Sequence, residues 1–203
     1  MKFYEETILP WVINRVMAKK EIALERKKMV PLASGRVLEI GMGSGFNIPF
    51  YSSDVEWLFG LEPSAQLKQY ASEKAEVAPF PVEFVGLTGE EVPLDDNSID
   101  TVVSTWTMCT IPDMSKALAE IDRILKTDGK LIFVEHGLSP DRTIRIIQNS
   151  LNPAWKRIGG GCHLNRPIDE MIREAGFHIQ RKENGYMDGK NPLSFLYRGE
   201  ARR

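Results

Sequence analysis

The chain has 203 residues, of which 42% are hydrophobic and 27% are charged, and its formal net charge is -2. This balance excludes a disordered chain, a collagen-like repeat and a polytopic membrane protein, and the length suits one ordinary domain with a substantial core. A nearly neutral chain has no overall electrostatic attraction to nucleic acid, so a nucleic-acid partner is not expected.

The cysteine content and the first residues indicate a compartment. Cys109 and Cys162 are too few for a disulfide framework and favour a reducing environment. The start of the chain is acidic and lacks the apolar core and cleavage site of a signal peptide. No stretch approaches the roughly 20 apolar residues of a membrane-spanning helix. A cytoplasmic protein is therefore expected.

Residues 1–34 predict a helical extension. Apolar side chains recur there at helical spacing, and Pro10 interrupts them, which fits two short helices or one kinked helix. The charged run 18–29 predicts an exposed helix, because its basic residues alternate with Glu21 and Glu25 as on a solvated face. We expect the extension to form a lid over the acceptor that also packs against the sheet. Contact of the extension with a membrane surface remains an alternative.

Beyond the extension, strand and helix patterns alternate, which predicts a parallel sheet covered on both faces. The last two strand patterns are separated by the turn pairs Asn184-Gly185 and Asp188-Gly189, which predict a closing hairpin. The expected ligand site of such a doubly wound α/β sheet lies outside the carboxyl ends of the strands. Strands are predicted at 36–40, 55–61, 82–85, 98–104, 130–135, 177–181 and 194–199, and helices at 63–77, 114–125, 142–153 and 167–175.

A glycine-rich loop follows the first predicted strand. Glycine at every second position of 41–45 permits positive φ and a close approach of the backbone to a ligand. Phe46 stands where a dinucleotide fingerprint needs its last glycine, and the loop lacks the lysine of a phosphate cradle. Glu39 would repel a pyrophosphate and attract an ammonium group, and Glu62 can accept hydrogen bonds from both hydroxyls of a ribose. The pattern predicts a ligand with a cationic amino-acid end and an unphosphorylated ribose, and S-adenosylmethionine has both.

These residues resemble a known family. Residues 39–45 (EIGMGSG) resemble the first motif of class I S-adenosylmethionine-dependent methyltransferases. Further similar segments are the ribose-binding acid at 62–64, the loop beside adenine at 89–94, the fourth-strand segment at 96–111 and the turn at 125–131. The resemblance implies a Rossmann-like, seven-stranded, mostly parallel sheet with an antiparallel last strand over residues 35–203. It also implies S-adenosylmethionine as cofactor and S-adenosylhomocysteine as product.

The resemblance also implies a set of cofactor-binding residues. Thr88 stands where the family commonly has aspartate, so backbone groups near Thr88 would serve adenine instead. The candidates are Glu39, Gly41, Met42, Gly43, Gly45, Asn47, Glu62, Pro63, Ser64, Thr88, Gly89, Glu90, Ser104, Thr105 and Trp106.

The region after the fifth predicted strand is similar to the thiol S-methyltransferase branch known from animals, the methyltransferase-like 7 proteins. The similar residues there are Glu135-His136, the NPAW of 152–155 and the GCHLNR of 161–166, and earlier in the chain Cys109 also falls where that branch has a cysteine. The resemblance implies a small thiol as methyl acceptor. The chain departs from the branch at Asn152, at His163 and in its N-terminal segment.

The expected acceptor pocket contains His136, Trp155 and His163, with the two histidines as catalytic residues. A phospholipid amine or a quinone or phenol remains the alternative acceptor, and a non-enzymatic cofactor-binding module is the third hypothesis. Cys109 and Cys162 taken with His163 do not give a recognised zinc spacing, so no metal site is expected.

Overall fold

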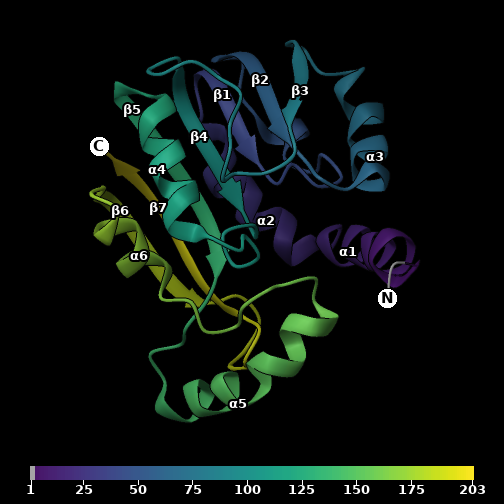
Figure 1. The fold of residues 1–203 in the computed structure, drawn as a ribbon, viewed down its shortest axis with the longest axis vertical. Coiled ribbons are helices and arrows are strands. Elements are labelled where there is room, and N and C mark those ends of the chain that lie inside the picture. Colours follow the sequence, from purple (N-terminus) through teal and green to yellow (C-terminus); the bar gives the residue numbers. More distant parts are fainter. Residues whose placement is uncertain (1–2) are drawn as a thin grey trace.

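The computed structural model describes residues 3–203 (Figure 1). Residues 1 and 2 of the expected extension lie outside the described residues. The strands are β1 (Gly35–Ile40), β2 (Val55–Leu61), β3 (Val82–Gly86), β4 (Ile99–Thr105), β5 (Leu125–His136), β6 (His178–Tyr186) and β7 (Phe195–Arg202). The helices are α1 (Leu9–Met17), α2 (Lys20–Met29), α3 (Ala65–Ala75), α4 (Met114–Ile124), α5 (Arg142–Ile158) and α6 (Ile168–Glu174).

The strands form one seven-stranded sheet in the order β3-β2-β1-β4-β5-β7-β6. β1 pairs in parallel with β2 and β4, β2 with β3, and β4 with β5. β7 runs antiparallel to both β5 and β6. The prediction of a mostly parallel, doubly wound sheet with an antiparallel last strand and a closing hairpin is confirmed. The strand order reverses between β1 and β4, so a ligand crevice is expected beyond the carboxyl ends of these two strands.

Side chains that alternate along the strands contribute to two hydrophobic cores, one on each face of the sheet. Leu38 and Ile40 point to the core under α4 and α6, whereas Val37 points to the core under α2 and α3. Figure 1 shows α4 and α6 on one face of the sheet and α2 behind it. The sheet is thus covered on both faces, which explains why its central strands are apolar almost throughout.

Side chains at the helix starts fix where the helices begin. Asp113 accepts a hydrogen bond from the backbone N–H of Lys116 at 3.0 Å and caps α4. Asp141 caps α5 by accepting from the N–H groups of Thr143 and Ile144. Such caps satisfy backbone donors that have no partner within the helix.

Several predicted boundaries were wrong. Pro153 does not end α5, which continues to Ile158. The carbonyl that Pro153 leaves without a helical partner belongs to Asn149, an exposed residue where water can replace the bond. The N-terminal segment has two consecutive short helical pieces, as one of the two expectations had it: a π-helical turn (Tyr4–Ile8) and then α1. Pro10 lies in the first turn of α1, where its missing N–H costs little.

Two predicted turns lie inside strands. Asp128-Gly129 forms an irregularity in β5, where the pairing with β4 shifts between Ile99 and Thr101. Asn184-Gly185 belongs to β6, which runs to Tyr186, and the hairpin connection follows it. In both cases pairing with a neighbouring strand overrides the local preference of the dipeptide for a turn.

The prediction of an exposed helix at 18–29 was wrong for one face of α2. Ile22, Glu25, Arg26 and Met29 are buried, with at most 5% of each exposed. Their spacing of i, i+3, i+4 and i+7 places them on one side of the helix. Glu25 forms a buried ion pair with Arg198 of β7, at 2.5 Å from its Nε, so the helix is fixed to the sheet by charge as well as by apolar packing.

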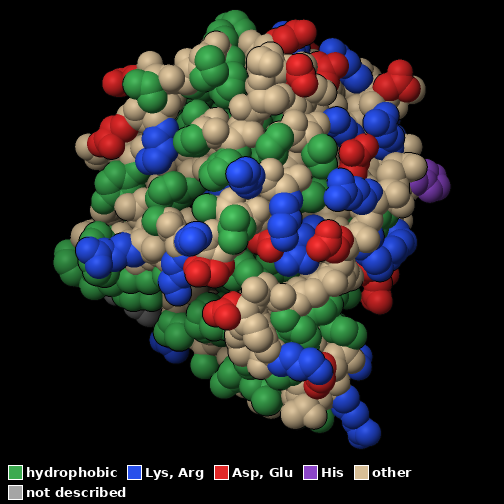
Figure 2. Space-filling view, turned by 180° about the vertical axis from the view of Figure 1, so that it is seen from behind, with side chains coloured by type: hydrophobic (Ala, Val, Ile, Leu, Met, Phe, Trp, Pro, Cys, Tyr) green, Lys and Arg blue, Asp and Glu red, His purple; other side chains and the backbone are tan. Residues whose placement is uncertain are grey.

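α5 lies away from the centre of the sheet (Figure 1), and none of its residues belongs to either core. Figure 2 shows hydrophobic side chains gathered at the α1 end of the molecule and over its lower part, where α5 lies. Exposed apolar residues on these elements include Trp11, Val16, Ile146, Leu151 and Ile158. Among residues 3–203, no helix combines the length and apolar content needed to cross a membrane.

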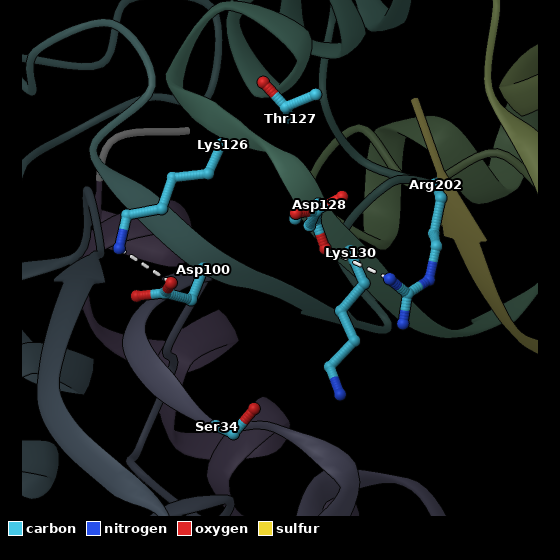
Figure 3. Close-up of a pocket in the computed structure, with 8 residues that line it drawn as sticks. Ser34, Asp100, Lys126, Thr127, Asp128, Lys130 and Arg202 are labelled. Atoms are coloured by element: carbon cyan, nitrogen blue, oxygen red, sulfur yellow. Dashed lines mark hydrogen bonds and ion pairs between the residues drawn. The ribbon is translucent and has the colours of Figure 1, made fainter.

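A polar hollow of about 470 Å³ lies at the amino-terminal edge of β4 and β5 (Figure 3). Two of its cationic side chains have partners: Lys126 contacts Asp100 at 2.7 Å, and Arg202 donates to the backbone carbonyl of Asp128. The hollow is at the edge opposite to the glycine-rich loop, so it is not where the predicted ligand would bind.

Candidate active site

The carboxyl ends of the parallel strands gather most of the residues singled out in the sequence. Residues 39 and 40 end β1 and residues 41–47 follow it, residues 62–64 follow β2, and residues 104 and 105 end β4, with Trp106 next. Residues 88–90 follow β3, and His136 is the last residue of β5. His163 is distant in sequence but is brought to the same edge, because its backbone N–H donates to the carbonyl of Cys109 at 2.7 Å.

The glycine-rich loop has the backbone that its composition predicts. Gly41, Gly43 and Gly45 have φ of 68°, 58° and 70°, a region that other L-residues avoid. A side chain at Gly41 would collide with Thr107, whereas the space over Gly43 is open except for one carbonyl at 3.9 Å. The loop therefore offers a ligand an uncovered stretch of backbone at Gly43.

Gly43→Ala is expected to weaken cofactor binding far more than it weakens the fold. The methyl group would enter the open space over the loop, and the positive φ would cost about 1–2 kcal/mol. The matched control is Gly189→Ala, which has the same backbone cost at φ 62° in a connection far from the loop. Both variants should lose similar thermal stability, and only Gly43→Ala should lose cofactor affinity by calorimetry; equal affinities would contradict the assignment.

Glu62 is buried and fixed by two backbone donors. Its carboxylate accepts from the N–H of Gly43 and of Ser64, each at 2.8 Å. Burial raises the pKa of Glu62, and these two hydrogen bonds oppose the rise. Each carboxylate oxygen retains a second acceptor site, so the oriented group can still receive two hydroxyl hydrogen bonds.

Glu39 lies at the centre of a buried polar network. Its carboxylate accepts from the amide of Asn47 at 2.9 Å and from the hydroxyl of Tyr51 at 2.7 Å. Asn47 also binds Thr105, and its amide oxygen accepts from Nε of Arg26 at 2.9 Å. Glu39 therefore organises the loop from within, and its carboxylate lies among protein groups rather than at the loop surface.

Arg26 crosses from α2 into this network. Its guanidinium lies over the rings of Phe46 and Trp106, 5.4 Å from each centroid, and burial lowers its pKa to about 10. Trp106 itself has φ of 53°, an uncommon value for a tryptophan. The contact between a cation and two aromatic faces fixes the position of the ring at the end of β4.

Glu39→Gln is expected to flatten the pH dependence of stability between about pH 4.5 and 7. Burial, opposed by the contacts with Tyr51, Arg26 and Asn47, raises the pKa of Glu39 from 4.5 to about 7. In that window the folded chain binds a proton that the unfolded chain has lost, so wild-type stability falls as the pH rises through it.

The measurement is the urea unfolding free energy of wild type and variant at pH 5 and pH 8. The glutamine variant should gain stability relative to wild type on going to pH 8. Glu56→Gln, at an exposed position of β2, is the control and should show no such relative gain. A constant difference between wild type and Glu39→Gln would contradict the burial of a carboxyl group at this position.

Other cofactor candidates have different neighbours from those their motifs suggest. The side chain of Met42 packs in the core against Gly60, so only its backbone faces the loop surface. Ser104 donates to Glu135 at 2.8 Å, and Ser64 caps α3 by accepting from Leu67. Pro63 and Thr88 are exposed, Gly89 is buried, and Glu90 accepts from the N–H of Asp113.

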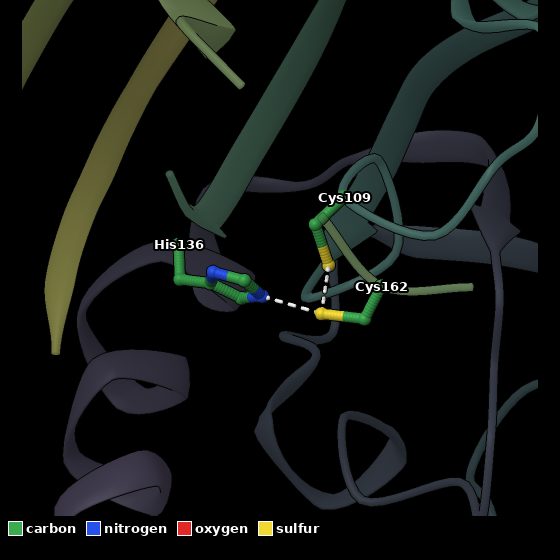
Figure 4. A group of neighbouring side chains, drawn as sticks. All are labelled: Cys109, His136 and Cys162. Atoms are coloured by element: carbon green, nitrogen blue, oxygen red, sulfur yellow. Dashed lines mark hydrogen bonds between the residues drawn. The ribbon is translucent and has the colours of Figure 1, made fainter. Parts of the chain in front are cut away.

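The acceptor side contains a cluster that was not predicted. Nε2 of His136 lies 2.9 Å from Sγ of Cys162, and the two cysteine sulfurs lie 3.7 Å apart (Figure 4). Burial lowers the pKa of His136, but its contact with Cys162 and the charge of Glu135 outweigh that effect and raise it. In the sequence the cysteines show no recognised metal spacing with His163, whereas the fold places them beside His136.

Charged groups surround the cluster. Arg166 is buried and donates to the carbonyl of Met108, and its guanidinium interacts electrostatically with Cys109, Cys162 and Glu135. His163 lies beside Arg166, and burial together with the charges of Arg166 and Lys156 lowers the pKa of His163 to about 4. His163 is therefore neutral at neutral pH and can accept a hydrogen bond.

Sequence reasoning missed Arg26, Tyr51 and the grouping of the cysteines with His136. For Arg26 a signal exists, because Ile22 and Met29 are seven residues apart and place Arg26 on their side of the helix. For the cysteine cluster the sequence offers no comparable signal. Its members are far apart along the chain and meet only through the sheet topology.

Comparison with known proteins identifies the family. A methyltransferase domain model matches residues 38–133. Thiol S-methyltransferase TMT1B of Rattus norvegicus is 30% identical over 186 residues, which cover 85% of this chain and 76% of that protein. Thiol S-methyltransferase TMT1B of Homo sapiens is 34% identical over 171 residues, which cover 81% and 70%.

The chain is a member of the S-adenosylmethionine-dependent methyltransferase family. Solved structures agree with the fold: a methyltransferase of Thermotoga maritima superposes with a TM-score of 0.68 at 22% identity, covering 99% of this chain and 98% of that one. Phospholethanolamine N-methyltransferase 2 of Haemonchus contortus, solved with S-adenosylhomocysteine, has a TM-score of 0.66 at 20% identity, covering 90% and 46%. The cofactor of the methyltransferase is accordingly S-adenosylmethionine.

The residues at the carboxyl edge of the methyltransferase fit this cofactor. The open backbone at Gly43 and the oriented carboxylate of Glu62 suit an amino-acid end and a ribose. Oγ of Ser44 is buried in the same loop without a hydrogen-bond partner among the described residues. A buried hydroxyl of this kind calls for a polar ligand or water.

Proposed function

We propose that the methyltransferase transfers the methyl group of S-adenosylmethionine to the sulfur of a small thiol. The supporting observation is the extent of the similarity to thiol S-methyltransferases. The domain model ends at residue 133, whereas the matches to four such proteins span 170–186 residues of alignment. The similarity thus extends past the cofactor-binding segments into the region where the acceptor would bind.

Methyl transfer to a thiol depends more on how the enzyme positions the sulfur than on proton transfer by a side chain. S-adenosylmethionine supplies a methyl group that is already electrophilic, so the enzyme must place a nucleophile in line with it. A thiol with an ordinary pKa near 8.5 is partly ionised at neutral pH. Glu62, the loop at Gly43 and Ser44 would hold the cofactor, and the residues beyond β5 would hold the sulfur.

Two histidines are the proposed acceptor-side residues. His136 is the last residue of β5, and its Nε2 lies 2.9 Å from Sγ of Cys162, on the side where the acceptor sulfur would bind. His163 is neutral at neutral pH and can accept the hydrogen bond of an incoming thiol. Trp155 offers an indole Nε1 that is buried without a partner among residues 3–203.

We propose that residues 1–34 act with α5 as a cover over this side. The hydroxyl of Tyr4 donates to the carbonyl of Ile158 at 2.5 Å. A Cβ added at Gly160 would lie 2.7 Å from the side chain of Leu9. The start of the extension and the end of α5 therefore meet next to the loop that carries Cys162 and His163.

The test is product mass spectrometry with a panel of acceptors. The purified enzyme and S-adenosylmethionine would be incubated separately with sulfide, a small organic thiol, a phenol, a quinol and phosphatidylethanolamine vesicles. Methanethiol or a methyl thioether, formed with an equal amount of S-adenosylhomocysteine, is the expected result. Methylation confined to the phenol, the quinol or the lipid would contradict the proposal.

A lipid acceptor is the second candidate. The exposed apolar residues of α1 and α5, among them Trp11 and Leu151, could rest on a membrane surface. Phosphatidylethanolamine N-methyltransferase of Cereibacter sphaeroides is 32% identical, but over only 104 residues and 50% of this chain. Activity that requires vesicles, together with co-sedimentation of the enzyme with them, would favour this candidate over the thiol.

A further inference from the structure

Three segments far apart in the sequence bring two sulfurs and an imidazole together (Figure 4). Cys109 lies in the connection between β4 and α4, His136 ends β5, and Cys162 lies between α5 and α6. The sulfurs are 3.7 Å apart, and Nε2 of His136 is 2.9 Å from Sγ of Cys162. All three ligand atoms lie within 4.8 Å of one another.

Backbone contacts hold the three segments in register. The N–H next to Cys162, that of His163, donates to the carbonyl of Cys109 at 2.7 Å. The N–H of Leu138, two residues after His136, donates to the carbonyl of Arg166 at 2.9 Å. The side chains are thus presented by a cross-linked frame rather than by independent loops, as a preorganised site requires.

The spacing suits a small thiophilic cation. Zinc binds sulfur at about 2.3 Å and imidazole nitrogen at about 2.0–2.1 Å, so a tetrahedral site separates two sulfurs by roughly 3.8 Å and sulfur from nitrogen by roughly 3.5 Å. The observed sulfur separation of 3.7 Å already fits this geometry. His136 and Cys162 would need to move apart by roughly half an ångström, which side-chain rotation can supply.

We propose that Cys109, His136 and Cys162 bind a divalent cation of the zinc class and leave its fourth position for the acceptor thiol. Thiolate and imidazole donors select such ions, and zinc sites with three protein ligands keep one position for substrate. Cys109 and His136 are buried and Cys162 is half-buried, so the approach lies on the Cys162 side. The acceptor role rests on the proposed function, whereas binding of the ion does not.

The proposed methyl transfer conserves atoms and electron pairs. The acceptor thiol loses its proton to solvent on binding the cation, because a coordinated thiol is deprotonated. Its sulfur forms the new bond to the methyl carbon while the sulfonium carbon–sulfur bond breaks with its electron pair. The products are a thioether and S-adenosylhomocysteine. The thiols of Cys109 and Cys162 release their protons to solvent when the cation binds, so the two thiolates and the divalent cation are together neutral. The bound acceptor thiolate adds one negative charge, which lies near the guanidinium of Arg166.

The test is titration of the reduced, chelator-treated full chain with Co²⁺, followed by competition with Zn²⁺ and a chromophoric chelator. We expect one ion per chain and the thiolate-to-cobalt charge-transfer band of a tetrahedral site, abolished by Zn²⁺. Cys109→Ser and Cys162→Ser should each weaken Zn²⁺ binding by more than the roughly 10–100-fold that changes around the ligands cost. His178→Asn, at an exposed histidine of β6, should bind as wild type does.

The wild-type spectrum alone decides the matter if a serine variant fails to fold. Absence of the charge-transfer band in the folded, reduced wild type overturns the site, and so does a band that survives in folded Cys162→Ser. A Cys109–Cys162 disulfide in protein isolated without reductant, with no ion bound after reduction, also overturns it.

Equal thiol methylation by metal-free and zinc-loaded enzyme overturns the acceptor role only. Tight zinc binding without any thiol methylation overturns the proposed function and leaves the metal site intact.

Discussion

Glu62→Ala is expected to weaken S-adenosylmethionine binding by about 100-fold or more. Two hydroxyl hydrogen bonds to a charged acceptor are each worth about 1.5–3 kcal/mol, and both disappear with the carboxylate. The substitution also frees the N–H groups of Gly43 and Ser64, which the carboxylate holds at 2.8 Å. Cofactor affinity measured by isothermal titration calorimetry, with S-adenosylhomocysteine as a second ligand, gives the result.

Two further variants show whether the loss of cofactor affinity comes from the carboxylate of Glu62 itself. Glu62→Gln retains the size and one acceptor oxygen, so its affinity should fall between those of wild type and Glu62→Ala. Glu83→Ala, at an exposed position of β3, should leave affinity unchanged. Thermal melting would confirm that each variant is folded. Wild-type affinity in a folded Glu62→Ala would show that the ribose is held elsewhere.

Glu25→Ala is expected to destabilise the protein by about 3–5 kcal/mol, because it leaves the buried guanidinium of Arg198 with only its longer ion pair to Glu183, at 3.9 Å. Only 6% of the Arg198 side chain and 7% of the Glu25 side chain are exposed, and two of their atom pairs lie at 2.5 Å and 3.2 Å. For a chain of this size the melting temperature should fall by roughly 6–20 °C. Differential scanning calorimetry measures both quantities.

The double variant Glu25→Leu with Arg198→Met separates charge from packing. Replacing a buried ion pair by apolar side chains of similar volume is often neutral, so the double variant should recover most of the loss. Glu21→Ala, at an exposed position of the same helix, should change the melting temperature little. A loss in the double variant equal to that in Glu25→Ala would contradict the role of the unpaired charge.

The sheet could be predicted because its strands carry a strong local pattern. β4 is rich in β-branched residues, and Glu39 and Glu62 lie within one residue of the carboxyl ends of β1 and β2, at the edge where ligands bind. The glycines at 41, 43 and 45 require a backbone that few other residues adopt, and all three have positive φ. Local preferences and the fold agree at these positions, so the sequence alone is informative there.

Other features depend on contacts between distant segments. The sequence places Arg26 in a charged run that is typical of a solvent-exposed helix face. In the fold it is buried, because Asn47 and the rings of Phe46 and Trp106 surround its guanidinium. The pairing of Glu25 with Arg198 spans 173 residues, and no local pattern indicates it. The linear spacing of Cys109 and Cys162 likewise gives no hint that His136 lies beside them. Such groupings follow from topology, which a single sequence specifies only indirectly.

Transfer of an isotopically labelled methyl group from S-adenosylmethionine to sulfide and to a small organic thiol tests the account most directly. Wild-type enzyme should yield labelled methanethiol or methyl thioether in equal amount to S-adenosylhomocysteine, and folded Glu62→Ala should yield far less at a limiting cofactor concentration. The absence of label in any sulfur product, with cofactor bound by the wild-type enzyme, would contradict the assignment of a thiol methyltransferase.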